Sequence, residues 1–281
     1  MCIRDRINSG ARLDLDANLT VAGAVTVNDE LHIRYGSLTV TSGDFTNNDD
    51  IIVYAGKFLN IATGTLTNTD LIDIRSSASQ FGSLLLSNTL SNSGDIRYSR
   101  YVAGENYWDL IGSPLSGYNV EDFILQNDDI IKQGTEGNYT YAVGTYTNTA
   151  AAYSSNEGWT NYTTATMDDG TLTPGKGYQM ATGNGAEITF KGDIETSDVS
   201  ISVTTNEQGT INPNDGTKFA LVANPYASYL SVASFLNAHK TNELHSNHVA
   251  VYGWDGSAYD TYSLASAGNG IAPGQGFMIG V

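Results

Sequence analysis

The chain has 281 residues, of which 30 are acidic and 13 are basic, so its formal net charge is −17. Such an acidic chain repels nucleic acids and anionic lipid surfaces, which argues against both as partners. Its single cysteine, Cys2, excludes an internal disulfide, and no apolar run is long enough to span a membrane. The chain holds 30 glycines and only 5 prolines, a balance typical of short strands joined by tight turns.

The first six residues differ from the rest of the chain. They carry the only cysteine and two of the 13 basic residues, and they lack the apolar core of a signal peptide. We therefore expect residues 1–6 to be a non-native leader from an assembled environmental sequence. The native N-terminus and any export signal would then be missing.

Residues 7–101 contain a repeat with a step of 20 residues. The repeated motif reads Asn28-Asp29-Glu30-Leu31, Asn48-Asp49-Asp50-Ile51 and Asn68-Thr69-Asp70-Leu71. A repeat of this length with short apolar alternations predicts the stacked coils of a right-handed parallel β-helix, a β-solenoid. In that fold Leu31, Ile51 and Leu71 would form one interior column, and the asparagines a ladder at a turn. A β-sandwich of regular hairpins is the alternative.

The same repeat places an acidic residue at each step. If the coils stack in this register, Glu30, Asp50 and Asp70 lie at the spacing of neighbouring strands, about 4.8 Å. One interpretation is that their charges turn outward and are screened by solvent. The other is that Ca²⁺ bridges neighbouring coils through these carboxylates and through carbonyl oxygens.

Basic residues follow three of the predicted strands, at Arg34, Arg75 and Arg97, and Tyr54 occupies the corresponding place between the first two. A polysaccharide lyase or hydrolase built on a β-helix needs bases and acids gathered on one strand face. A solvated outer face is the alternative interpretation of these residues.

The second part of the chain is an internal duplication, with copies at residues 102–205 and 206–281. Trp108, Pro114 and Tyr118 recur 111 residues later as Phe219, Pro225 and Tyr229. Two Pro-Gly-x-Gly turns, residues 174–177 and 273–276, also correspond and suit type II turns; they lie 99 residues apart because the first copy holds more residues between its motifs. We predict a β-sandwich or jelly-roll-like region with short helices at 120–126 and 231–239. The second copy stops before any counterpart of strands at 188–203, so we expect it to be truncated.

Two resemblances arise from these motifs. The pattern "G-x-L-T-V … T-N-x-x-x-I-x-V" resembles β-helix repeats of secreted bacterial surface proteins. The sequences "L-V-A-N-P-Y-A-S-Y-L", "Y-G-W-D" and "I-A-P-G-Q-G-F-M-I" in residues 221–279 are similar to a region common in proteins exported by the bacterial type IX secretion system. This resemblance implies a secreted or cell-surface location, with a sorting domain following the region. It implies no particular activity, since activities vary among such proteins.

Aromatic residues at comparable places in the two copies are candidates for ligand binding. They are Trp159, Tyr162, Trp254, Tyr259 and Tyr262. Exposed rings of this kind stack on sugar rings and would form a glycan-binding face. The alternative is that they pack as cross-strand partners within the sheets.

The sequence shows no catalytic constellation, since it contains no nucleophile elbow, phosphate loop or metalloprotease spacing. We therefore expect a non-catalytic extracellular structural or adhesive module that needs no cofactor, with Ca²⁺ as a candidate ligand of the acidic residues. Its expected partners are extracellular glycans or other surface proteins. The alternative is a carbohydrate-active protein, either a glycan-binding module or a β-helix lyase or hydrolase.

Overall fold

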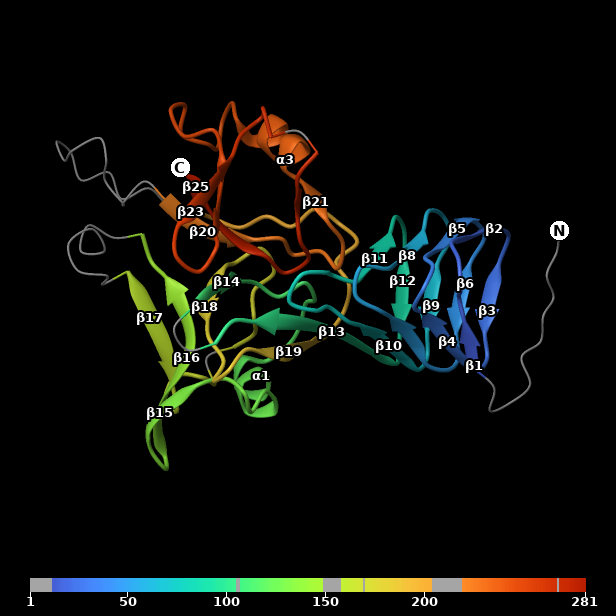
Figure 1. Ribbon diagram of the computed structural model, residues 1–281, viewed down its shortest axis with the longest axis horizontal. Helices are drawn as coiled ribbons and strands as arrows, with labels where there is room; N and C mark the ends of the chain where they lie inside the picture. The colour runs from blue at the N-terminus through green and yellow to red at the C-terminus, as the bar shows by residue number, and fades with distance from the viewer. Residues whose placement is uncertain (1–11, 105–106, 149–157, 169, 204–218, 267) are drawn as a thin grey trace. The chain divides into compact units, whose positions relative to one another are not determined.

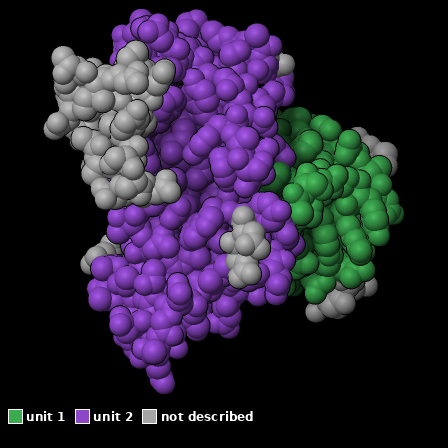
Figure 2. All heavy atoms as spheres, turned by 60° about the vertical axis from the view of Figure 1, so that its left-hand side comes forward, with its two compact units in different colours: residues 1–100, 189–198 green, residues 101–188, 199–281 purple. Residues whose placement is uncertain are grey.

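The computed structural model describes residues 12–104, 107–148, 158–168, 170–203, 219–266 and 268–281 (Figure 1). The chain divides into two compact units, coloured separately in Figure 2. The solenoid unit contains Met1–Arg100 and Thr189–Asp198, and the duplicated unit contains Tyr101–Ile188 and Val199–Val281. The predicted fold class is confirmed, because a solenoid of about four turns is followed by antiparallel sheets. No helix in the described ranges combines the length and apolarity required to cross a membrane.

Each coil of the solenoid unit contributes one strand to each of three sheets with parallel pairing between coils (Figure 1). The first sheet contains β1 (Arg12–Asp14), β4 (Glu30–Ile33), β7 (Ile51–Val53), β10 (Leu71–Ile74) and β13 (Asp95–Val102), with β19 (Ala186–Lys191) at its edge. The second contains β2 (Leu19–Ala22), β5 (Leu38–Ser42), β8 (Phe58–Ile61) and β11 (Ser83–Leu86). The third contains β3 (Val25–Val27), β6 (Phe45–Asn47), β9 (Leu66–Asn68) and β12 (Leu90–Asn92).

The interior of the solenoid is a set of apolar columns, and one of them corrects the predicted register. Leu31 pairs with Ile51 as predicted, but Ile51 pairs with Ile72 and not with Leu71. The column continues to Ile96, and all four of these side chains are buried. The step from Ile51 to Ile72 is one residue longer than the step before it, and a shift of one residue turns a strand side chain to the opposite face. Leu71 is accordingly only partly buried.

A buried asparagine ladder runs along the third sheet. The Nδ2 of Asn47 donates to the Oδ1 of Asn68 at 2.8 Å, and the Nδ2 of Asn68 donates to the Oδ1 of Asn92 at 2.8 Å. Asn48 belongs instead to an exposed rung, where it donates to Asn28 at 2.9 Å. The ladder of asparagines expected at a turn is therefore present. Because the step from Asn47 to Asn68 is 21 residues and not 20, Asn68 stacks on Asn47 in the buried ladder and not on Asn48.

The ladder ends on a segment that comes from much later in the chain. The Nδ2 of Asn92 donates to the Oδ1 of Asp193 at 2.7 Å, and the Gly192 N–H donates to the Ile96 carbonyl at 3.2 Å. Residues Thr189–Asp198 therefore pack on the last coil. By sequence they fall within the first copy of the duplication, residues 102–205, and their alternating pattern suits any exposed strand.

In the duplicated unit, the two copies form antiparallel sheets of the same strand order. The first contains β14 (Asp109–Ile111), β18 (Tyr178–Met180), β16 (Asn138–Tyr146) and β15 (Lys132–Thr135), with β17 (Trp159–Thr163) also on β16. The second contains β20 (Phe219–Ala223), β25 (Gly276–Gly280), β22 (Val251–Trp254) and β23 (Tyr259–Tyr262). Strands β21 (Leu230–Ser231) and β24 (Gly270–Ile271) form a separate pair. Thus β14, β18, β16 and β17 correspond to β20, β25, β22 and β23.

Both predicted helices are present, and each begins at a capping side chain. Helix α1 (Val120–Gln126) begins after Asn119, whose side chain accepts from the Asp122 N–H at 3.1 Å. Helix α3 (Val232–His239) begins after Ser231, whose hydroxyl accepts from the Ser234 N–H at 3.2 Å. The second helix starts one residue later than expected because Ser231 is its cap.

The Pro-Gly turns have the expected backbone conformation in both copies, and in the second copy a buried asparagine binds one of them. Gly175 and Gly274 have φ values of 80° and 62°, in the left-handed region that a type II turn requires at its third position. In the second copy, the side chain of Asn224 donates to the carbonyls of Ile271 at 3.0 Å and Ala272 at 3.1 Å. This buried amide therefore fixes one Pro turn against the other.

Candidate functional site

An aromatic cluster lies where the two copies of the duplicated unit meet. Its rings pack on the buried side chains of Leu110 from β14, Leu221 from β20 and Met278 from β25. We call these rings the aromatic surface: Tyr146, Trp159, Phe219, Tyr252, Trp254 and Tyr259. All six are partly exposed, and Tyr259 is the most open, at 45% of its full exposure.

The aromatic surface contains two ring pairs at equivalent positions of the two copies. Tyr146 and Trp159 are opposite each other on β16 and β17, with ring centroids 4.9 Å apart and planes inclined by 54°. Trp254 and Tyr259 are opposite each other on β22 and β23, with centroids 4.9 Å apart and planes inclined by 58°. The duplication therefore presents the same tilted aromatic pair twice.

The two ring pairs are neighbours, because Trp159 and Trp254 pack on the same cluster of buried side chains. Burial raises the pKa of Tyr146, and burial followed by the proximity of Tyr146 raises the pKa of Tyr259. Both phenols are therefore neutral at physiological pH and can donate as well as accept hydrogen bonds. The pairs together offer apolar ring faces and polar hydroxyls, the combination that binds the C–H faces and hydroxyls of a sugar.

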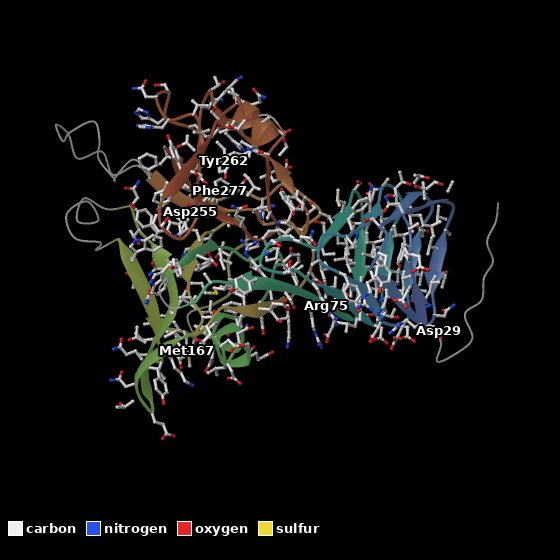
Figure 3. All side chains as sticks on the ribbon, in the orientation of Figure 1. Asp29, Arg75, Met167, Asp255, Tyr262 and Phe277 are labelled. Carbon is white, nitrogen blue, oxygen red and sulfur yellow. The ribbon has the colours of Figure 1, made fainter. Side chains whose placement is uncertain are left out.

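A rigid turn orients the second pair. The carboxylate of Asp255 accepts from the backbone N–H groups of Ser257 and Ala258, both at 2.7 Å, and these hydrogen bonds lower its pKa. Asp255, labelled in Figure 3, directly follows Trp254 and leads into the strand that carries Tyr259. The exposed carboxylate of Asp255 therefore fixes the turn that joins the strands of Trp254 and Tyr259.

The structure separates the five aromatic residues singled out from the sequence. Trp159, Trp254 and Tyr259 belong to the aromatic surface, whereas Tyr262 packs against the hydrophobic core of the second copy, near the buried Phe277 (Figure 3). Tyr162 takes the position equivalent to Tyr262, since each lies three residues after a paired ring. Three residues along a strand lead to the opposite face, which explains the division.

Three members of the aromatic surface were not among the predicted site residues: Tyr146, Phe219 and Tyr252. Phe219 contacts Tyr252 edge to face, with centroids 5.3 Å apart and planes inclined by 87°. Twelve residues separate Tyr146 from Trp159, whereas four separate Trp254 from Tyr259, so aligning the copies by their Pro turns does not reveal that Trp159 is the partner of Tyr146. Strand pairing alone does so.

Strand register aligns the acidic residues of the solenoid unit only in part as predicted. Since Ile51 pairs with Ile72, Asp50 is aligned with Leu71, and Asp70 is aligned with Asp49. Asp49 and Asp70 are equivalent, because each accepts from the next backbone N–H, at 2.7 Å and 2.9 Å. Glu30 and Asp50 keep the expected alignment.

The charges of this region still influence one another. The pKa of Asp50 is raised first by burial and then by the negative charges of Asp70, Asp49 and Glu30. Within the described residues, however, no group of three or more histidine, cysteine, aspartate or glutamate side chains could hold a metal ion. Calcium bridging through carboxylate and carbonyl oxygens stays a prediction.

Comparison with known proteins identifies a family without assigning an activity. No match was found among curated proteins or among solved structures. Residues 16–280 match the model of a family described as a domain of unknown function, DUF8693. Because this match covers the solenoid and both copies of the duplication, the chain belongs to the DUF8693 family.

Proposed function

We propose that this protein is a non-catalytic adhesive module that binds extracellular glycans through the aromatic surface. In this proposal the solenoid unit is a rigid structural support, and the duplicated unit makes the contact. The observation that carries the proposal is the repeated ring pair, Tyr146 with Trp159 and Trp254 with Tyr259, on one partly exposed surface.

The tilt of the rings supports binding as well as packing. Tilted pairs at about 5 Å are the arrangement that aromatic rings prefer for their own contact, so part of each ring stabilises the fold. The rings that remain partly exposed also carry the neutral hydroxyls of Tyr146 and Tyr259. Sugar rings, which have apolar faces and polar rims, match this mixture better than purely apolar ligands do.

We further propose that the module works in the secreted space or on a bacterial cell surface. The resemblance of residues 221–279 to proteins of the type IX secretion system supports this location, and so does the net charge of −17, which keeps a protein soluble outside the cell. Export by that system is testable by expressing the full gene in a host with and without its secretion machinery and assaying the medium and cell surface.

A glycan array tests the binding proposal directly. The intact chain should bind one class of neutral or mixed glycans, and Trp254→Ala and Trp159→Ala should each weaken that binding roughly tenfold or more, the effect of losing about 1.4 kcal/mol of stacking. Tyr229→Ala is the matched control, because Tyr229 is 50% exposed in the same unit but lies outside the aromatic surface. Binding that survives both tryptophan substitutions in folded protein would show that the aromatic surface is not the contact.

A further inference from the structure

The outward face of the first sheet carries a repeated ion-pair pattern. Arg12, Arg75 and Arg97 are each paired with an aspartate two residues away on the same strand. The distances are 3.0 Å to Asp14, 2.6 Å to Asp73 and 2.9 Å to Asp95. These three guanidinium charges are therefore neutralised within their own strands.

Arg34 breaks this pattern. By strand register, His32 occupies in β4 the row that Asp73 occupies in β10, so the position two residues before Arg34 holds no carboxylate. Within the described residues, Arg34 makes no ion pair, and its side chain is exposed. His32 itself lies 3.7 Å from Asp14 and 3.4 Å from Glu30.

Two tyrosine rings hold the unpaired guanidinium in place. The Cζ of Arg34 lies 5.3 Å from the ring centroid of Tyr35 and 5.3 Å from that of Tyr54. The Tyr54 hydroxyl in turn contacts the Nδ1 of the buried His32 at 3.2 Å, and Arg75, labelled in Figure 3, lies 5.4 Å from the same ring. Tyr35 is 58% exposed. Cation–π contacts of this kind orient the guanidinium and leave its N–H edge for a ligand.

We propose that Arg34, Tyr35 and Tyr54 form a second carbohydrate site, which binds the carboxylate of a sugar acid while its ring stacks on tyrosine. Arginine binds carboxylates in bidentate geometry, and the adjacent ring faces suit the apolar side of the same sugar. One uncompensated cation in a chain of net charge −17 favours a ligand whose negative charges are sparse. A polysaccharide that alternates acidic and neutral sugars fits this requirement, and a densely charged polyphosphate does not.

This site is independent of the proposed function, because it lies in the solenoid unit and shares no residue with the aromatic surface. It is tested by calorimetric titration of the intact protein with a hexasaccharide that alternates glucuronate and N-acetylglucosamine. We expect Arg34→Gln to weaken binding at least about tenfold, as the loss of a charge-assisted hydrogen-bond pair implies. Arg97→Gln is the matched control, because Arg97 lies on the same sheet and is neutralised by Asp95.

Three further arms complete the test. Tyr35→Ala should also weaken binding, and the carboxyl-reduced hexasaccharide should bind at least about tenfold more weakly to the wild-type protein. A sulfated hexasaccharide that binds as well as the carboxylate would identify the site as one for sulfated sugars and overturn the assignment to sugar acids.

Two results would refute the site altogether. One is the absence of binding by the wild-type protein, and the other is equal binding by Arg34→Gln and Arg97→Gln. Equal binding of this kind, together with a loss of binding in Trp254→Ala, would place the acidic sugar on the aromatic surface. That outcome would refute the Arg34 site while supporting the proposed function.

Discussion

The two units of this protein are both built by repetition, but the repeats meet in different ways. In the solenoid unit, equivalent residues of successive coils are hydrogen-bonded neighbours, as Leu31, Ile51, Ile72 and Ile96 show. In the duplicated unit, equivalent residues lie in separate sheets, as in the ring pairs on β16–β17 and β22–β23. A short repeat therefore predicts contacts between its copies, whereas a long repeat predicts only the structure within each copy.

This difference has an energetic consequence. A residue in one coil of the solenoid unit is confined by the backbone of the next coil, so a small change at a corner is transmitted along the stack. A residue in one copy of the duplicated unit depends mainly on its own sheet. Substitutions at stacked positions should therefore be the most destabilising, and the following predictions test this from the largest expected effect to the smallest.

The largest effect is expected for Gly64→Ala, at a corner between the second and third sheets. Gly64 has a φ of 87°, and an added Cβ would meet the backbone carbonyl of Gly43 in the preceding coil. Gly23 also has a positive φ, 142°, but an added Cβ there meets nothing within 4 Å. We expect Gly64→Ala to cost on the order of 3–5 kcal/mol of unfolding free energy.

Gly23→Ala is the control, because it carries the backbone strain without the stacking contact and should cost about 1–2 kcal/mol. Hydrogen exchange of the buried amides of the solenoid unit measures both free energies. Equal costs at the two positions would show that the coils do not confine one another at their corners.

An intermediate effect is expected for Asn68→Ala in the buried ladder. The fully buried side chain of Asn68 accepts from Asn47, donates to Asn92 and also donates to the Asp70 carbonyl at 2.9 Å. Removing it leaves buried polar groups without partners, which should cost roughly 2–4 kcal/mol. Asn48→Ala, in the exposed rung, should cost less than about 1 kcal/mol. Similar urea midpoints for the two variants would contradict the stacking of Asn68 on Asn47 and Asn92.

The smallest effect is expected for Asp50→Asn. Burial and neighbouring acids raise the folded-state pKa of Asp50 above its usual value of 3.8, so the folded state binds this proton more readily than the unfolded state does. Stability from this group is therefore present at low pH and is lost as pH rises through the raised pKa. At pH 7 the variant should be slightly more stable than the wild type, by less than about 0.5 kcal/mol given its solvent screening.

The pH dependence supplies the measurement. The difference in melting temperature between Asp50→Asn and the wild type should disappear as the pH falls below 3.8, the usual value for this carboxyl. A variant that is less stable than the wild type at pH 7 would show that the carboxylate makes a favourable interaction, such as a bound cation.

The sequence by itself determined the local features of this protein. The 20-residue motif predicted stacked coils, the Pro-Gly pairs predicted turns with positive φ, and the two short helices predicted after the Pro turns lie at residues 120–126 and 232–239. These features depend on neighbours along the chain, on apolar alternation and on glycine at special backbone angles. They require no knowledge of which distant segments meet.

Tertiary structure decided everything that depends on register and on distant contacts. One extra residue between Ile51 and Ile72 moved Asp70 out of the acidic row and brought Asn68 into the buried ladder. Pairing of β16 with β17 joined Tyr146 to Trp159, and the place of His32 in the row of Asp73 left Arg34 without a carboxylate. A shift of one residue reverses the face of every side chain that follows, so small differences in coil length outweigh a visible repeat.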